Sequence, residues 1–399
     1  MKKSLNINAG IALLLDECSD AFTGYDNVSL NAGNVVISRK LNDKLSGTGF
    51  VINSGNTSVI DVSGKVVELG SKTVITASES YDGCYVVCPG LLIIESIDGL
   101  AGITGLYADT IFHPESVDLS TVNGILASRK IAYPDGAKLR LEDLTIDAES
   151  ALYMDNSLYW VYGTITAIEN DALENLRSKE AAFRCKSLIV RTGLFDKFGD
   201  MFKAESFLLV PDDHAYADEI TLNAATSTLY SDKLFVAGDM LIQHDQIQHL
   251  SGFASLIVKG TVTMPVSAAK DFKSCGKAED FDLYEGVLIT INGDETISHE
   301  QLQKACELGI RYTLKVNGEV AFLEGVTAED TEAIAAIHCN GVVYAPGAAR
   351  SILDGKVKSL NGEVLDISEY GNEAGSKSDA GPGDDCEDSS INTGIYRLK

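Results

Sequence analysis

The chain has 399 residues, of which 45% are hydrophobic, so it can bury one large core or two to three ordinary ones. Its 58 acidic residues outnumber 32 Lys and Arg, and the formal net charge of −26 argues against nucleic acid as a partner, since that needs basic residues to neutralise phosphates. Apolar runs such as Ile11–Leu15 and Leu91–Ile94 are too short for a signal peptide or a membrane span. Eight cysteines without paired spacings suit reduced thiols, and we expect a cytoplasmic protein.

Residues 1–45 are predicted to form an N-terminal cap or the first coil of a repeat. They contain a short apolar run, Ala12–Leu15, and a stretch of mixed charge, Ser38–Leu45. A cap is expected there because the open end of stacked strands exposes unpaired backbone groups.

Residues 46–284 are predicted to be the body of a mainly β, solenoid-like repeat architecture. Apolar residues alternate along many short runs, and in five of them a glycine takes one of the alternating positions, which indicates a bend inside a strand. These runs are Ile60–Val66, Tyr159–Ile165, Leu256–Val262, Leu314–Val320 and Ile337–Val343. Further strands are predicted at Leu106–Phe112, Ile125–Ala132, Leu139–Ile146, Cys185–Val190, Phe202–Val210, Ile220–Leu222 and Leu229–Leu241. Tandem β-sandwiches or α+β domains would show a similar spacing of strands and turns along the sequence.

Residues 285–370 are predicted to alternate strands with short helices and to form a possible separate subdomain. Ser298 and Gln301 have the spacing of a capping box, which predicts a helix that starts at Ser298. A second helix is predicted from Thr327 towards Ile337 by the same logic.

Residues 371–399 are predicted to be a flexible acidic tail. The segment 371–390 holds Gly, Ser and acidic residues and no aliphatic residue larger than alanine. It ends in a more apolar and basic peptide, Ile391–Lys399. This peptide is either a frayed terminus or a tethered element that docks on a neighbouring copy by adding a strand to an open edge.

Several residue groups could carry chemistry, but each has a simpler structural interpretation. Cys84 and Cys88 would lie about 13 Å apart on one strand, too far for a shared metal ion. Gly47–Gly49 is only a fragment of a phosphate loop and favours a turn. Aromatic residues Trp160 and Tyr162 share a strand face and favour packing against a neighbouring coil over a carbohydrate platform.

Two groups of polar residues are candidate catalytic or metal sites. His244, Asp245 and His249 form one, and their spacing of five does not align ligands on a helix. Asp212, Asp213 and His214 form the other, where a turn is expected after Pro211. We assign no catalytic, metal or cofactor-binding residue and expect no cofactor.

The sequence thus favours a non-catalytic structural or self-assembling scaffold, whose partners are copies of itself. A polysaccharide-active enzyme with an acidic groove is one rival, for which Asp212 and Asp213 would be the acids. A module that binds a basic protein through its acidic surface is the other.

Overall fold

The computed structural model describes residues 3–15, 22, 24–62, 65–122, 124–370 and 387–397. The fold is mainly β with interspersed helices, and its strands form five small sheets, which we name A to E in chain order. The strands within each sheet are paired in parallel. The mainly β prediction is confirmed, whereas all-parallel pairing excludes the β-sandwich alternative, which is antiparallel.

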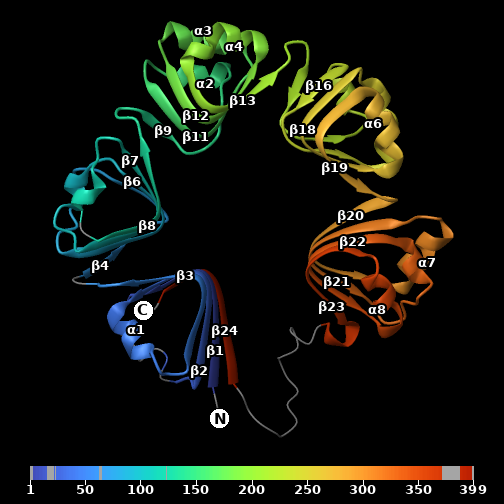
Figure 1. Cartoon of the computed structure of the whole chain (residues 1–399), viewed down its shortest axis with the longest axis horizontal. Coiled ribbons are helices and arrows are strands. Elements are labelled where there is room, and N and C mark those ends of the chain that lie inside the picture. Colours follow the sequence, from blue (N-terminus) through green and yellow to red (C-terminus); the bar gives the residue numbers. More distant parts are fainter. Residues whose placement is uncertain are drawn as a thin grey trace.

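Each sheet and its helices make one unit, and the five units follow one another around a ring (Figure 1). The sheets lie towards the inside of the ring and the helices lie on its outer side (Figure 1). The predicted boundary after residue 45 falls inside sheet A, and the one after residue 284 falls between sheets D and E.

Unit A contains both ends of the described chain. Its strands, in sheet order, are β24 (Glu387–Arg397), β1 (Lys3–Leu14), β2 (Asn27–Ser38) and β3 (Phe50–Ile60). Helix α1 (Arg39–Leu45) begins where the Ser38 hydroxyl accepts a hydrogen bond from the Leu41 amide, and it buries Leu41 and Leu45 against the core face of the sheet.

Units B, C and D each begin with a strand that is divided into two short pieces. In units B and C the two pieces pair with the two halves of the next long strand. In unit D they pair with the two pieces of a second divided strand. Sheet B has β4 (Lys65–Glu68), β5 (Lys72–Ile75), β6 (Cys84–Ile94), β7 (Gly105–Pro114) and β8 (Ile125–Tyr133). Sheet C has β9 (Lys138–Arg140), β10 (Leu144–Thr145), β11 (Leu158–Ala167), β12 (Ala182–Arg191) and β13 (Phe202–Val210). Its helices are α2 (Ala148–Tyr153), α3 (Asn170–Ser178) and α4 (Thr192–Phe198).

Unit D has two divided strands before its long ones. Sheet D has β14 (Ala215–Ala217), β15 (Ile220–Leu222), β16 (Lys233–Val236), β17 (Met240–Ile242), β18 (Ser255–Pro265) and β19 (Gly276–Tyr284), with helices α5 (Thr226–Leu229) and α6 (Ala269–Cys275). Unit E has β20 (Val287–Ile297), β21 (Tyr312–Phe322), β22 (Ile334–Ala345) and β23 (Val357–Asp366), with helices α7 (His299–Glu307) and α8 (Gly347–Asp354).

The core of each unit lies between the sheet and its helices. In unit C the buried residues of β11 alternate along the strand, and Tyr159, Phe183 and Phe202 stack on successive strands with ring centroids 5.6 and 5.2 Å apart. Helix α3 adds Leu173 and Leu176 to the same core. The opposite faces of sheets A to D contribute apolar residues to contacts between units.

The predicted glycine bends are best formed in sheet E. Gly341 has φ +147°, and a Cβ there would stand 1.9 Å from the carbonyl oxygen of Gly318 on the neighbouring strand. Only glycine fits, because the backbone conformation and the close approach both exclude a side chain. The glycine run at Ile60–Val66 is not such a unit, since β3 ends at Ile60 and β4 begins at Lys65.

Two other local predictions are corrected and one is confirmed. The capping box at Ser298 is present, and α7 follows it. The helix predicted from Thr327 is wrong: only a 3-10 turn forms at Asp330–Ala333, because the Thr327 amide and hydroxyl both donate to Asp330 and β22 starts directly afterwards. The strand predicted at Leu229–Leu241 is interrupted, since α5 ends at Leu229 and two short strands follow.

Candidate functional site

The units meet through the sheet faces that their own helices do not cover, and we call each such contact a joint. At the joint between units A and B, Leu13 and Val36 of sheet A pack with Val87 and Tyr107 of sheet B. Tyr85 is also buried there, and its hydroxyl has no hydrogen-bond partner. Burial, followed by the nearby Tyr107, raises the pKa of Tyr85 to about 12.

The joint between units B and C is aromatic. Phe112 of β7 is only 1% exposed and lies edge-on to Trp160 and Tyr162 of β11, with ring centroids 6.1 and 4.9 Å away. Tyr133 of β8 also contacts Trp160 at 5.9 Å. Trp160 and Tyr162 therefore cover the neighbouring unit, as the structural interpretation of these residues predicted.

The joint between units C and D combines apolar packing with a polar cluster. Ile189 and Val210 of sheet C pack with Phe235 of sheet D. Beside them lies the turn Asp212–His214, which the sequence offered as an acid–base site.

The Asp212–His214 turn bonds to both units. Asp212 accepts from the Gly193 amide at 3.0 Å, and Arg191 donates to the His214 carbonyl at 2.8 Å, both from unit C. On the side of unit D, the Asp213 carboxylate accepts from Lys233 at 2.6 Å, and Lys233 with His214 lowers the pKa of Asp213 to about 2.

His214 links this turn to β18. Its Nδ1 is 2.7 Å from Asp213 Oδ1, and its Nε2 is 3.0 Å from Ser255 Oγ. Serine, histidine and aspartate in this order are the arrangement of a hydrolytic triad. Here Asp213 is shared with Lys233 and the ring is only 8% exposed, so the cluster is better understood as a polar fastening between units C and D.

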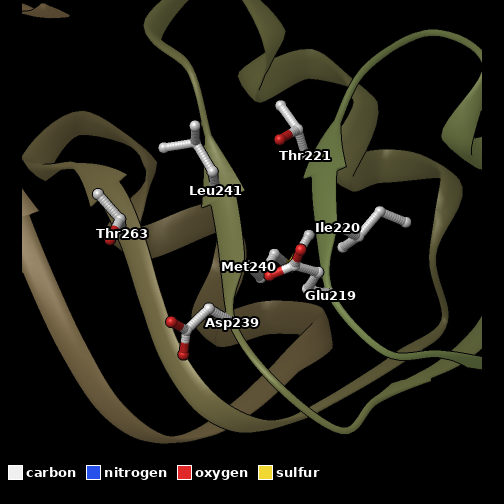
Figure 2. A pocket seen from close by; sticks show the side chains of 7 residues that line it. All are labelled: Glu219, Ile220, Thr221, Asp239, Met240, Leu241 and Thr263. Carbon is white, nitrogen blue, oxygen red and sulfur yellow. The ribbon is translucent and has the colours of Figure 1, made fainter. Parts of the chain in front are cut away.

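The joint between units D and E is polar and leaves a hollow. Asp282 of β19 accepts from Lys315 of β21 at 2.5 Å, and both side chains remain about one-third exposed. On the same sheet, residues of unit D line a cavity of about 390 Å³ over β15, β17 and the second half of β18. Figure 2 shows its lining, in which Glu219 and Asp239 lie close to Met240, and Thr263 stands on β18, the neighbour of β17.

Units E and A have no apolar joint in the described part of the chain. The apolar face that unit E would offer, with Ala321 and Tyr344, is covered by its own Ile367 and Tyr370. The corresponding face of sheet A carries a ladder of asparagines, in which Asn31 donates to Asn8 at 2.8 Å and Asn53 donates to Asn31 at 2.9 Å.

Strand β24 is what ties the end of the described chain to unit A. It pairs in parallel with β1 from Lys3↔Glu387 to Leu13↔Arg397 (Figure 1). The peptide for which the sequence left two interpretations, a frayed terminus or docking on a neighbouring copy, instead adds a strand to a sheet of its own chain. The predicted flexible segment between Tyr370 and Glu387 lies outside the described residues. We name the backbone edge of β1 that receives β24 the closing edge.

A repeated sequence explains this pairing, although our sequence analysis missed it. The four strands of sheet A share the pattern Ile or Leu, then Asn, any residue, Gly; the copies are Ile7–Gly10, Leu30–Gly33, Ile52–Gly55 and Ile391–Gly394. Pairing places the copies in register, with Asn392 beside Asn8 and Asn31 beside Asn53. Searching for this four-residue pattern, rather than for alternation, would have assigned the C-terminal peptide to the first sheet.

The remaining candidates have structural roles or lie at the surface. Cys88 is buried on β6, burial raises its pKa, and Cys84 lies at the start of the same strand. His244 and His249 lie in a 3-10 turn, His244–Gly252, and Gly47–Gly49 is a turn after α1. Within the residues that the structure describes, no group of His, Cys, Asp or Glu is arranged to hold a metal ion.

Comparisons with protein families, with curated proteins and with solved structures give no match for this chain. Over the described ranges, no helix has the length and apolar character that crossing a membrane requires.

Proposed function

We propose that the protein is a non-catalytic, self-assembling scaffold of the cytoplasm, built from short β-solenoid units. The solenoid interpretation is supported by the way the chain advances in each unit. It passes from one parallel strand to the next in steps of 19 to 25 residues. In sheets A and E, asparagines also stack on successive strands. Such steps are typical of stacked-repeat architectures.

One observation supports the scaffold function most strongly: sheet A is completed by a strand from the far end of the chain. A strand that recognises an open sheet edge through its backbone is a general means of assembly. The groups that could have carried catalysis, such as Asp212 and Asp213, are instead engaged in bonds that hold units together.

The test is the size of the purified protein. Light scattering coupled to size-exclusion chromatography, with negative-stain images, is applied to the full chain over a range of salt, divalent-ion and protein concentrations. We expect a defined oligomer or filament in part of that range. A monomer under every condition would contradict the scaffold function.

A further inference from the structure

We infer that the closing edge of one molecule also accepts strand β24 of a second copy, so that the molecules join head to tail by strand exchange. The inference rests on the proposed function and names its partner and its contact. The two copies would contribute the same residues that pair within one chain, so no new surface is required.

The closing edge is a complete template for a strand. Leu5 and Ile7 of β1 pack in the core of unit A with residues of β2 and α1, and these contacts hold β1 through elements other than β24. Its register with β24 continues without a shift across the bend, as does the register between β1 and β2. Backbone bonds along such an edge supply affinity, and register supplies selectivity.

Selectivity for β24 comes from the repeated Asn-x-Gly pattern. A Cβ on Gly33 would lie 3.0 Å from the Gly10 carbonyl oxygen, so glycine lets the two strands approach closely at this point. Strand β24 brings Gly394 to this position and Asn392 beside Asn8. A strand shifted by one residue would lose both matches and reverse its core and outer faces.

Exchange between copies is favoured because the junction of units E and A has no apolar cluster in the described residues. Among the described residues, no buried apolar cluster contains side chains of both unit E and unit A. In the described residues, the end of the chain is therefore held to unit A by the pairing of β24 with β1, which an identical strand from a second copy can replace. The segment 371–386 spans at most about 55 Å when fully extended. Strand β24 can pair with β1 of its own chain or with β1 of a second copy. Pairing between copies is favoured when the protein concentration exceeds the effective concentration of the tethered strand.

Engineered cysteine pairs test the exchange directly. Asn6 pairs with Ser390, and neighbouring strands lie about 4.8 Å apart, a distance that a disulfide can span. Chains with Asn6→Cys are mixed with chains with Ser390→Cys at high concentration, refolded together and oxidised. We expect a disulfide-linked dimer of the two different chains on a non-reducing gel.

Three controls show whether the disulfide reports the predicted pairing between copies. Each variant oxidised alone reports links made by the eight natural cysteines. The pair Asn6→Cys with Tyr396→Cys is out of register, since Tyr396 pairs with Ala12, and should not link. One chain that carries Asn6→Cys and Ser390→Cys together, oxidised when dilute, should close on itself and show that the site is intact.

A second measurement works even if the cysteine variants fold poorly. A labelled peptide of residues 387–399 is added to a chain that ends at Tyr370, and binding is followed by fluorescence anisotropy. We expect saturable binding, lost when the peptide carries Asn392→Pro, because proline cannot donate to the β1 ladder. An absence of binding would overturn the assignment of the closing edge.

The outcomes separate this inference from the proposed function. Oligomers of the full chain that persist when it ends at Tyr370 would overturn strand exchange and leave the scaffold function standing. Full chains that remain monomeric at every concentration would overturn both. Oligomers that disappear on truncation, together with the interchain link, would support both.

Discussion

The joint between units C and D and the joint between units D and E use the same part of the fold with opposite chemistry. In sheet C the row of residues that faces the next unit includes Ile189 and Leu208. In sheet D the equivalent row is Leu241, Thr263 and Asp282. The first row is packed against Phe235. In the second row, Leu241 and Thr263 line a cavity of about 390 Å³, and Asp282 forms an ion pair with Lys315 of unit E.

This difference shows that the repeat determines where two units meet but not how strongly they are held. Burying an aromatic ring and its neighbours contributes several kcal/mol, while an ion pair that is one-third exposed contributes about 1 kcal/mol or less. We therefore expect units A to D to behave as one stable block and unit E to be held more weakly.

The largest expected effect is at the aromatic joint. Phe112→Ala should lower the free energy of unfolding of units B and C by about 3–5 kcal/mol, because it leaves a cavity beside Trp160 and Tyr162. Thr263→Ala stands at the matching position of sheet D and should cost well under about 1 kcal/mol. Hydrogen-exchange mass spectrometry, which reads each unit separately, measures both. Equal losses would remove the contrast between the joints.

The polar joint should become stronger when it is made apolar. Replacing the ion pair by Asp282→Leu together with Lys315→Leu should stabilise the contact of units D and E by about 1 kcal/mol, since a partly exposed ion pair contributes little and two apolar side chains can be buried in its place. Protection of β20 and β21 amides from exchange reports the gain. A loss of protection would show that the ion pair itself holds this joint together.

Tyr85 tests whether the joint between units A and B is apolar throughout. Its buried hydroxyl has no partner, so Tyr85→Phe should raise the free energy of unfolding by about 1 kcal/mol. Tyr107→Phe, at the same joint, is the matched comparison. Chemical denaturation measures the midpoint of each variant, and a clear destabilisation by Tyr85→Phe would mean that its hydroxyl is satisfied.

The smallest effect is expected from Lys315→Met alone. This substitution breaks the pair with Asp282 but leaves the partly exposed carboxylate in contact with water, so the loss should be under about 1 kcal/mol. The stability of the natural joint should also fall as salt is added, while that of the variant should not. Thermal unfolding at low and high salt compares the two.

Much of the strand content could be predicted from local pattern. Alternation identified β7, β13 and β15, and the capping box at Ser298 identified α7, because these signals lie within a few neighbouring residues. The helix expected at Thr327 failed because Asp330 turns its carboxylate back to Thr327, a bond that no periodicity reveals.

The joints and the closing edge could not be predicted in this way. Alternation indicates that Trp160 and Tyr162 share a face but not that Phe112 meets them, since this contact joins separate units. The pairing of Ile391 with Ile7 depends on residues at opposite ends of the chain. Only the repeated Asn-x-Gly pattern connects them at the level of sequence.

The pairing of β1 with β24 also has a consequence for the making of the protein. Units B to E can fold in order as the chain leaves the ribosome, because each is built from consecutive residues. Unit A cannot complete its sheet until residues 387–397 have been synthesised. Throughout translation the closing edge therefore stays open, and on a message read by several ribosomes the nearest available strand can belong to another nascent chain.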